Sequence, residues 1–448
     1  MHLPGLLAPL LAPLLGPALS SAGCIVALPV PLPIHPTHLM AALAWLPAGA
    51  LLVMLLRLEH MLGRAPRLTP RPASPLVEAH PQQPVEPPVH SGWLRVVVPA
   101  YQESQNISGC VASVLASEDP GLPWQLLVVD DGSTDDTPAL ARQACLKAPS
   151  TMETHVLEAG PRPTSQRWCG KNWPASVGAE APWPEGEPGD QWLLFLDADV
   201  RLAPAALVSA VEEAKRSSAD LLSLAPRLSC TCLAEWLVQP IVINFLGLEF
   251  PLQRTNDADD PTAFAAGPFM LFNRRAYEAI GGHAAMPSEV VEDLALARRI
   301  KASGYRLRYL LGLDLVHLSM YPDLAALWEG WTKNWYLGVD RNPVRAAGSA
   351  VVALLLYTVP WLMVVLGLLG RAAFVPLSNP LEAWFWPGMV AIGLQWFIRL
   401  WAQWRFLLPT RFWWLAWMGG LLIGAIVPVS VFRTITTRGW TWRGRPLG

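Results

Sequence analysis

Long apolar runs mark both ends of this 448-residue chain. Leu39 to Leu56 carries no charge and is long enough to span a bilayer, and similar runs occur at about 350–370, 381–401 and 412–432. Tryptophan gathers at the ends of the three later runs, which is typical of membrane interfaces. Residues 1–37 are also apolar but are broken by prolines. Whether they form a signal-like segment, a further span or upstream sequence stays open.

The middle of the chain has a different pattern, in which short apolar runs alternate with helical periods. A Pro-rich polar linker precedes it at 65–92. A helical period follows at 107–115, Thr137 and Pro138 form an N-cap and first turn, and Pro204 opens another helix. This β-α-β-α order predicts an α/β domain with a mostly parallel sheet covered by helices. The predicted strands are 94–101, 125–131, 192–199 and 221–226.

Composition agrees with a membrane protein. Charged residues make up 15% of the chain, compared with about 25% in average soluble domains, and hydrophobic residues make up 52%. The net charge of −2 argues against a nucleic-acid partner, because phosphate binding requires a basic face. Six cysteines form no paired framework, and the Cys230-x-Cys232 pair has no neighbouring His cluster, so we expect no zinc site.

Positive charge indicates how the chain is oriented. Arg57, Arg64, Arg67 and Arg71 follow the first span, so the positive-inside rule places the central domain in the cytoplasm. Three further spans would place the C-terminal tail outside, although that tail carries several arginines. We therefore expect one segment to lie in the interface or to re-enter, and the Trp-rich segment 381–401 is the candidate.

Carboxylates gather at the ends of the predicted strands. Ligands of open α/β sheets bind beyond the carboxyl ends of the strands, where this chain has Glu103, Asp130, Asp131, Asp197 and Asp199. Asp-x-Asp at such a place can hold Mg²⁺ or Mn²⁺ through oxygen ligands, and the ion can neutralise a nucleoside diphosphate. Neither GxGxxG nor GxxxxGK[ST] is present, which excludes the usual dinucleotide and P-loop signatures.

A further acidic pair, Glu292-Asp293, lies at the start of a predicted helix. Val290, Leu294 and Ala297 have helical spacing, and Gly304 is a stop signal. Beside a sugar acceptor, Asp293 can take the hydroxyl proton as that hydroxyl attacks. Taken alone, the pair is better explained by a favourable interaction with the helix dipole.

Six segments occur in an order that resembles family 2 glycosyltransferases, and more narrowly the membrane-bound branch that glycosylates carotenoids, hopanoids and related lipids. The tail WTWRGRP at 440–446 is similar to the short ending of those proteins. The resemblance covers roughly 94–340. It rests on PAYQES (99–104), VVDDGST (128–134), WCGKNWP (168–174), FLDADV (195–200), GPFMLFNRRAYEAIGG (267–282) and VVEDLALARRIKASG (290–304).

The resemblance implies a GT-A fold, with helices on both faces of the sheet, and an inverting transfer that depends on Mg²⁺ or Mn²⁺. It implies that Asp199 is the metal ligand and Asp293 the catalytic base. Lys171, whose alternative role is that of a solvated surface lysine, is implied near the diphosphate. The residues implied to bind the nucleotide sugar are Pro99, Tyr101, Glu103, Asp130, Lys171 and Asp197.

One departure concerns processive relatives, which carry Gln-x-x-Arg-Trp after the base-bearing helix. This chain has Lys333-Asn334-Trp335 there, which favours transfer of one sugar per acceptor. Glu292, Trp331 and Trp335 are candidates for a wall around the sugar and acceptor, and a membrane anchor is the alternative for the two tryptophans. The apolar segment 234–250 is either an interfacial helix or buried packing.

These observations predict an integral membrane glycosyltransferase with a cytoplasmic catalytic domain. We expect it to transfer a hexose, by default glucose from UDP-glucose, to the hydroxyl of a bilayer lipid, with a carotenoid first among the acceptors. The alternatives are a processive polysaccharide synthase and a non-catalytic membrane protein that binds nucleotide sugars. The expected segments are 1–37, a span at 38–57, a linker at 58–93, the catalytic domain at 94–340, membrane helices within 350–432 and a basic tail at 433–448.

Overall fold

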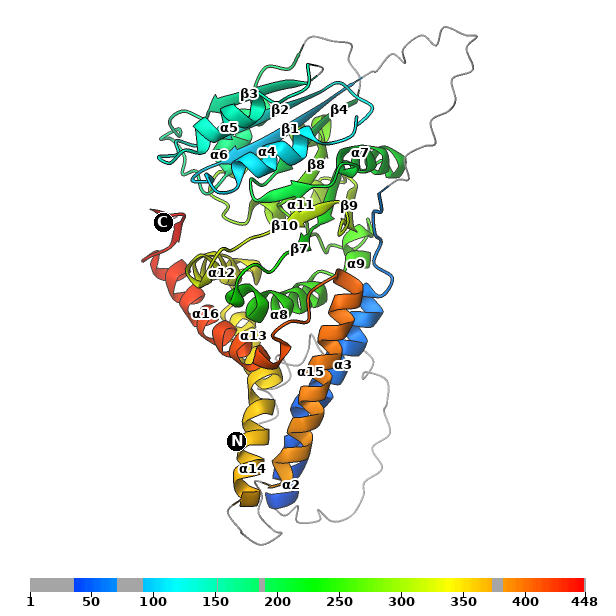
Figure 1. Ribbon diagram of the computed structural model, residues 1–448, viewed down its shortest axis with the longest axis vertical. Helices are drawn as coiled ribbons and strands as arrows, with labels where there is room; N and C mark the ends of the chain where they lie inside the picture. Colours follow the sequence, from blue (N-terminus) through cyan, green and yellow to red (C-terminus); the bar gives the residue numbers. More distant parts are fainter. Residues whose placement is uncertain (1–35, 71–91, 151, 185–189, 373–381, 447–448) are drawn as a thin grey trace, which may run out of the picture. The chain divides into compact units, whose positions relative to one another are not determined.

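The computed structural model describes residues 36–70, 92–150, 152–184, 190–372 and 382–446 (Figure 1). The N-terminal segment 1–35 and most of the predicted linker lie outside these residues. The chain forms two compact units, each assembled from separate stretches. The α/β unit comprises 64–231, 249–322 and 439–448, and the helical unit comprises 1–63, 232–248 and 323–438. Within the predicted segment 94–340, residues 232–248 and 323–340 group with the helical unit, and residues 439–446 of the tail group with the strands.

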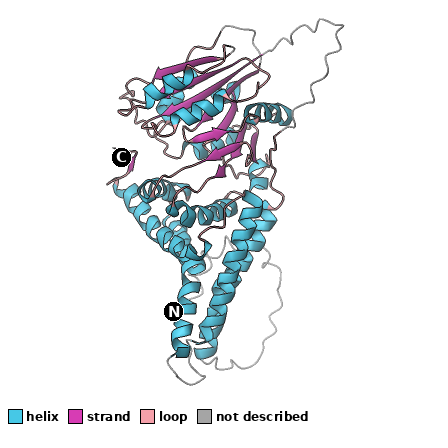
Figure 2. Ribbon diagram, viewed as in Figure 1, coloured by secondary structure: helices cyan, strands magenta, loops and turns pink. Residues whose placement is uncertain are grey.

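A seven-stranded sheet in the order β3-β2-β1-β4-β8-β6-β9 forms the centre of the α/β unit (Figure 2). Its neighbouring strands run parallel except at β8, which is antiparallel to both β4 and β6. A small second sheet has the order β5-β10-β7. The strands are β1 Gly92–Ala100, β2 Trp124–Asp130, β3 Glu153–Glu158, β4 Asp190–Leu196, β5 Val200–Leu202, β6 Leu221–Ala225, β7 Arg227–Leu228, β8 Phe269–Asn273, β9 Leu307–Leu311 and β10 Val316–Leu318.

Helices cover both faces of the large sheet, because successive side chains of a strand point to opposite faces. In β1, Val96 and Val98 pack into one buried cluster with α4, α5 and α7, whereas Val97 packs into the other with α6, α10 and α11. The predicted mostly parallel α/β fold, with helices on both faces, is confirmed. The helices are α4 Ile107–Leu115, α5 Thr137–Cys145, α6 Asn172–Glu180, α7 Ala206–Ser217, α9 Leu252–Asn256, α10 Arg274–Ala279, the 3-10 turn η1 His283–Ala285 and α11 Glu292–Ala302.

Two local predictions differ from the structure. The N-cap of α5 is Asp136, and Thr137 is already helical. The Thr137 hydroxyl does not cap the helix but accepts from the backbone N–H of Glu103 at 2.7 Å. Strand β4 ends at Leu196, three residues before the predicted end, so Asp197 and Asp199 lie in the turn beyond it. Because both residues lie outside the strand, their side chains do not follow its alternation between the two faces of the sheet.

The helical unit contains three helices that are long and apolar enough to cross a membrane, by length and composition. They are Met40–Leu62, Pro343–Ala372 and Trp413–Thr436. The unit's elements are α2 Pro36–Ala44, α3 Leu46–Leu62, α8 Leu233–Glu249, α12 Leu324–Gly338, α13 Pro343–Ala353, the π turn η2 Leu354–Thr358, α14 Val359–Ala372, η3 Glu382–Trp384, α15 Phe385–Phe406, η4 Trp413–Leu415 and α16 Ala416–Thr436.

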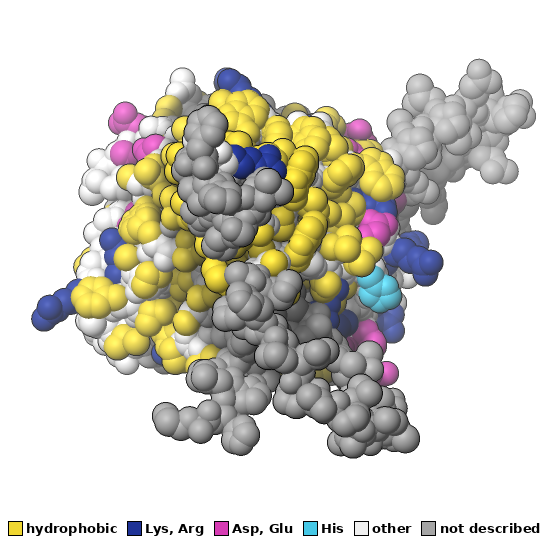
Figure 3. Space-filling model, turned by 90° about the horizontal axis from the view of Figure 1, so that it is seen from below, with side chains coloured by type: hydrophobic (Ala, Val, Ile, Leu, Met, Phe, Trp, Pro, Cys, Tyr) yellow, Lys and Arg dark blue, Asp and Glu magenta, His cyan; other side chains and the backbone are white. Residues whose placement is uncertain are grey.

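Hydrophobic side chains gather on the surface of the helical unit (Figure 3). Large exposed apolar patches are unusual for soluble proteins and suit contact with lipid. Helix α15 packs against both α3 and α14, and the prediction that 381–401 does not cross the bilayer stays a prediction. The large exposed apolar residues include Leu52, Leu56, Leu362, Val365, Leu369, Phe397, Leu400 and Trp404.

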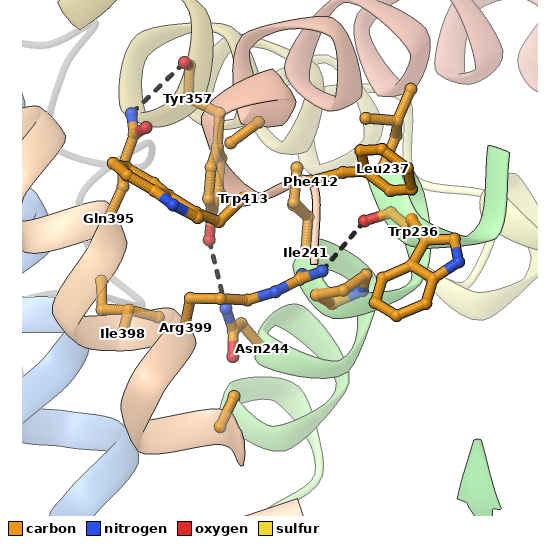
Figure 4. Close-up of a pocket in the computed structure, with 13 residues that line it drawn as sticks. Trp236, Leu237, Ile241, Asn244, Tyr357, Gln395, Ile398, Arg399, Phe412 and Trp413 are labelled. Atoms are coloured by element: carbon orange, nitrogen blue, oxygen red, sulfur yellow. Dashed lines mark hydrogen bonds between the residues drawn. The ribbon is translucent and has the colours of Figure 1, made fainter. Parts of the chain in front are cut away.

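Two prolines of the helical unit leave backbone carbonyls that α15 satisfies. Figure 4 shows the contact between Arg399 and Trp236. Pro360 has no N–H for the Leu356 carbonyl, which instead accepts from Gln395 Nε2 at 2.7 Å. Pro240 likewise leaves the Trp236 carbonyl, which accepts from Arg399 Nη2 at 3.1 Å. In a bilayer an unsatisfied carbonyl costs several kcal/mol. The polar residues of α15 therefore complete two broken helices.

A buried arginine likewise donates to backbone carbonyls of a helix in the α/β unit. Arg95 of β1 is 0% exposed and donates to four carbonyls at the end of α6 and just after it, of which the closest, those of Ala181 and Pro182, are at 2.7 Å. Its guanidinium lies 4.0 Å from the centre of the Trp183 ring. Burial lowers the pKa of Arg95 to about 10, so it is charged at neutral pH. Arg95 thereby fixes α6 against the sheet.

We expect Arg95→Met to lower the thermal unfolding temperature of the purified protein by roughly 4–8 °C. The carbonyls of α6 would lose their partner, at a cost of about 2 kcal/mol. Tryptophan fluorescence during heating measures the change. Arg216→Met is the matched control, because the Arg216 side chain is 70% exposed. Equal unfolding temperatures for the two variants would contradict this role of Arg95.

Candidate functional site

The end of β1 supplies the first part of the candidate site. Pro99 lies in β1 opposite Val129, and Tyr101 and Glu103 follow the strand, 9% and 7% exposed. Gln102 between them has a φ of 55°, a left-handed conformation that turns the chain sharply. Glu103 accepts from Asn106 Nδ2 at 2.9 Å. Burial raises the pKa of Glu103, although Arg443 opposes this shift.

Asp130, the last residue of β2, has one oxygen engaged and one without a partner. Its Oδ2 accepts from the backbone N–H groups of Gly132 and Ser133, at 3.1 and 3.0 Å. Its Oδ1 is buried and has no hydrogen-bond partner within the described residues. A buried carboxylate oxygen without a donor is costly. The oxygen is therefore suited to an N–H group of a ligand, such as the ring N–H of a nucleotide base.

The turn after β4 holds the Asp-x-Asp element. Asp197 forms an ion pair with Lys171, the residue that caps α6, and Lys171 Nζ also lies 3.1 Å from Glu292 Oε1. Burial alone would lower the pKa of Lys171, but Asp197 and Glu292 raise it overall, so the ammonium stays charged. Lys171 is thus not a solvated surface residue, since its side chain is only 21% exposed.

Asp199 combines burial with neighbouring negative charge. Burial, followed by the carboxylates of Asp197 and Glu103, raises the pKa of Asp199 to about 8. Its Oδ1 is buried and has no hydrogen-bond partner in the described part of the chain. Both observations indicate that a bound cation would stabilise the ionised form of this carboxyl group.

The donor set of this region fits a hard divalent ion. Among the described residues, no three His, Cys, Asp or Glu side chains form a ready-made metal cluster. Mg²⁺ is commonly held by only one or two carboxylates together with substrate phosphates, so a protein cage is not required. Asp199, with its unpartnered oxygen, is the residue that would hold the ion, and Asp197 lies beside it.

Asp293 lies in the first turn of α11, as predicted. Its Oδ2 accepts from the backbone N–H of Gly267 at 3.0 Å. A Cβ atom at position 267 would lie only 2.9 Å from that oxygen, so a larger residue there would displace the carboxylate. Burial and then the adjacent Glu292 raise the pKa of Asp293 to about 6, which suits a base that works near neutral pH.

Asn172 fixes the chain that leads into α11. Its Nδ2 donates to the carbonyls of Met286, Pro287 and Glu289, at 2.8 to 3.2 Å. Because Asn172 is the first residue of α6, one helix start positions both Lys171 and the approach to Asp293. Neither Asn172 nor Gly267 was among the predicted site residues, although both lie in motifs that the sequence shows.

The structure brings most of the predicted residues together in the α/β unit. Pro99 and Asp130 lie at the ends of the neighbouring strands β1 and β2, and Tyr101 and Glu103 follow β1. Lys171 joins Asp197 to Glu292. Trp331 and Trp335 belong instead to α12 of the helical unit, where Trp335 Nε1 donates to Ser349 at 2.9 Å. Their place at the sugar stays a prediction.

Three arginines of the site were not predicted. Arg162 and Arg445 both pair with Asp131 at 2.5 Å, and Arg443 pairs with Glu103 at 2.5 Å. The sequence places Arg443 and Arg445 in the tail, more than 300 residues beyond their partners. The signal available was the Trp-Arg-Gly-Arg pattern, which is that of a tight hairpin turn.

Parts of this chain are similar in sequence to known glycosyltransferases. The model of glycosyl transferase family 2 matches residues 95–153. A 4,4'-diaponeurosporenoate glycosyltransferase of Staphylococcus aureus (strain MRSA252) is 24% identical over 263 residues. That match covers 58% of this chain and 65% of the relative, which is less than two thirds of its length. The protein of strain USA300 is 23% identical over the same number of residues.

Solved structures give weaker likenesses. A mannosyltransferase from Pyrobaculum calidifontis, in complex with GDP-Man and Mn²⁺, has a TM-score of 0.48 and 16% identity over 90% of this chain and 99% of its own. Glucosyl-3-phosphoglycerate synthase from Mycobacterium tuberculosis, in complex with Mg²⁺ and UDP, has a TM-score of 0.34 and 18% identity over 55% and 78%.

We expect Mn²⁺ with UDP to raise the unfolding temperature of the protein, and Asp199→Asn to remove most of the Mn²⁺-dependent part. Ligand at about 100 times its Kd stabilises by roughly 2.7 kcal/mol. Scans with Mn²⁺ and with a chelator measure the effect. Asp119→Asn is the control, because Asp119 is exposed and only caps the N–H of Gly121. An undiminished Mn²⁺ effect in Asp199→Asn would refute this metal site.

Proposed function

We propose that this chain, a member of glycosyl transferase family 2, transfers a hexose from a nucleoside diphosphate sugar to a hydroxyl of a membrane lipid. The observation that carries the proposal is the ammonium of Lys171 between Asp197 and Glu292. This ion pair joins the Asp-x-Asp turn, which suits a diphosphate, to the helix that bears a base. Donor and acceptor groups of one transfer reaction would meet there.

The donor is proposed to bind along the ends of β1, β2 and β4. Its base would lie near Tyr101 and Glu103 and donate its ring N–H to the free oxygen of Asp130. Its diphosphate would lie near Lys171 and Asp199. A bound Mg²⁺ or Mn²⁺ supplies charge that stabilises the departing diphosphate. Lys171 adds a cation whose orientation is fixed by two carboxylates, so little reorganisation is needed. UDP-glucose is the donor we favour.

The acceptor hydroxyl is proposed to approach Asp293. In a single displacement the carboxylate takes the hydroxyl proton while the hydroxyl oxygen attacks the anomeric carbon and the nucleoside diphosphate leaves. One attack from the side opposite the leaving group inverts the anomeric centre. Gly267 holds Asp293 through its N–H and leaves room for it, so the base is positioned before the substrate arrives.

Lipid acceptors agree with the character of the helical unit. Its three long apolar helices and exposed apolar side chains would embed it in a bilayer, which holds the acceptor. A carotenoid is the first candidate, supported by the name of the Staphylococcus aureus relative. Lys333-Asn334 stand where processive synthases carry their motif, which supports single transfer.

The α/β unit is proposed to lie in the cytoplasm, where nucleotide sugars are made. Arg57 lies near the end of the first apolar helix, and Arg64 and Arg67 follow it, which supports this side. Residues 439–446 belong to the same unit as the strands, so an even number of crossings must separate them from residue 322. Of the later helices Pro343–Ala372, α15 and Trp413–Thr436, two would therefore cross and one would not.

The function is tested by comparing lipid extracts of cells that carry the wild-type gene, a deletion or Asp293→Asn. We expect one lipid to lose a hexose mass in both defective strains, because loss of a general base lowers the rate by about 10²–10⁴-fold. Mass spectrometry of the extracts gives the readout, and Glu289→Gln, at an exposed carboxylate before the same helix, is the matched control.

Two outcomes would change the proposal. Unchanged glycolipids in the deletion strain would refute lipid transfer and favour a protein that only binds nucleotide sugars. An alkali-labile product that forms equally well with Asp293→Asn would indicate a carboxylate acceptor, for which no base is needed.

The pH dependence of the transfer follows from the raised pKa of Asp293. The base must be ionised, so kcat/KM should fall about tenfold per pH unit below the pKa of about 6 and level off above it. Initial rates in nanodiscs between about pH 5 and pH 8 measure this, with the divalent ion saturating. Gly267→Ala should lower kcat more than it changes the donor KM. A flat profile would argue against Asp293 as the base.

A further inference from the structure

A tight hairpin lies at the end of the described chain. Strands β11 Thr441–Trp442 and β12 Arg445–Pro446 pair antiparallel, with Arg443 and Gly444 as the turn. Both turn residues have positive φ, 48° and 79°, which is the pattern of a type I′ turn. Glycine suits the second position, whereas arginine at the first is strained. Strain of this kind persists only where the surroundings hold the residue in place.

The hairpin is held by side chains of the candidate donor site. Arg443 pairs with Glu103 and also donates to the Gln102 carbonyl. Arg445 donates to the side chain and the carbonyl of Asp131, each at 2.5 Å. Its guanidinium also lies 3.5 Å from the centre of the Tyr101 ring. The hairpin thus contacts the ends of β1 and β2, where the base of the donor is proposed to bind.

The two arginines have capacity beyond these contacts. An isolated two-stranded hairpin is at best marginally stable, so these ion pairs and ring contacts hold it. Arg443 and Arg445 nevertheless remain 31% and 30% exposed, which leaves N–H groups able to reach a ligand. Arg443 is also close enough to counter the negative charge of Asp199.

The negative charge of the site indicates that an anionic ligand needs further cations there. Glu103, Asp130, Asp131, Asp197 and Asp199 make it strongly acidic, and a nucleoside diphosphate adds further negative charge. Cations in addition to Lys171 must offset this charge. A guanidinium binds phosphate oxygens in a bidentate manner and stacks on planar rings, and lysine does neither as well.

We propose that the hairpin 441–446 is the outer wall of the donor site, and that Arg443 and Arg445 bind the nucleoside diphosphate. Arg443 contacts the diphosphate beside Asp199. Arg445 remains on Asp131 and covers the base and ribose next to Tyr101. This inference rests on the proposed function, since it names further residues that bind the same donor.

The test measures the Kd of UDP, and separately of GDP, by calorimetry on the full chain in nanodiscs with Mn²⁺. We expect Arg443→Ala and Arg445→Ala each to weaken binding by about tenfold or more, as a lost charge-assisted contact does. Arg445→Lys keeps the charge but loses the fork, so it should bind with intermediate affinity. Arg438→Ala is the control, because Arg438 is an exposed arginine just before the hairpin, and it should bind as the wild type does.

Other results separate this inference from the proposed function. Wild-type protein that binds neither nucleotide would refute both. Wild-type binding that both alanine variants retain, with only the unfolding temperature without nucleotide lowered, would make the hairpin a purely structural element. Alanine variants that bind several-fold more tightly than the wild type would show that the hairpin blocks the site, which also overturns the inference.

Discussion

The site depends on one half-buried ammonium between two carboxylates. Lys171 pairs with Asp197 in the turn after β4 and with Glu292, the neighbour of the proposed base. Without it, Glu292 and Asp293 would stand as adjacent negative charges in one helix turn, next to the acidic Asp-x-Asp turn. Removing one partner from such a pair leaves an uncompensated charge that costs several kcal/mol. The same cation therefore stabilises the fold of the site and offsets negative charge beside Asp293, the proposed base.

Both units rely on long side chains that satisfy backbone groups of distant helices. Arg95 of β1 caps the end of α6, which positions Lys171. Gln395 and Arg399 of α15 donate hydrogen bonds to the backbone carbonyls that Pro360 and Pro240 leave without an N–H partner. In each case a polar residue inside an apolar element has a structural purpose. This explains why α15, although rich in tryptophan and bearing arginines, packs closely against its neighbours.

Local pattern predicted much of this architecture, because it depends on spacing alone. The strand end that carries Asp130, the helix 107–115 and the place of Asp293 in α11 all follow from short-range signals. The antiparallel strand β8 and the grouping of 232–248 with the other helical segments did not, since they depend on contacts distant in sequence. Arg443 and Arg445 were missed for the same reason. Nothing near them in the chain indicates Glu103 or Asp131 as partners.

The discontinuity of the α/β unit has a consequence for biosynthesis. Its strands are translated early, but the hairpin 441–446 follows α16 and leaves the ribosome only after the helices within 343–436. The ion pairs of Glu103 and Asp131 with the tail therefore form only once those helices have been made and the tail has returned to the strands. Assembly of the complete site is in this way ordered after translation of the segments that would anchor it, and a nascent chain arrested earlier would display the strands without the hairpin.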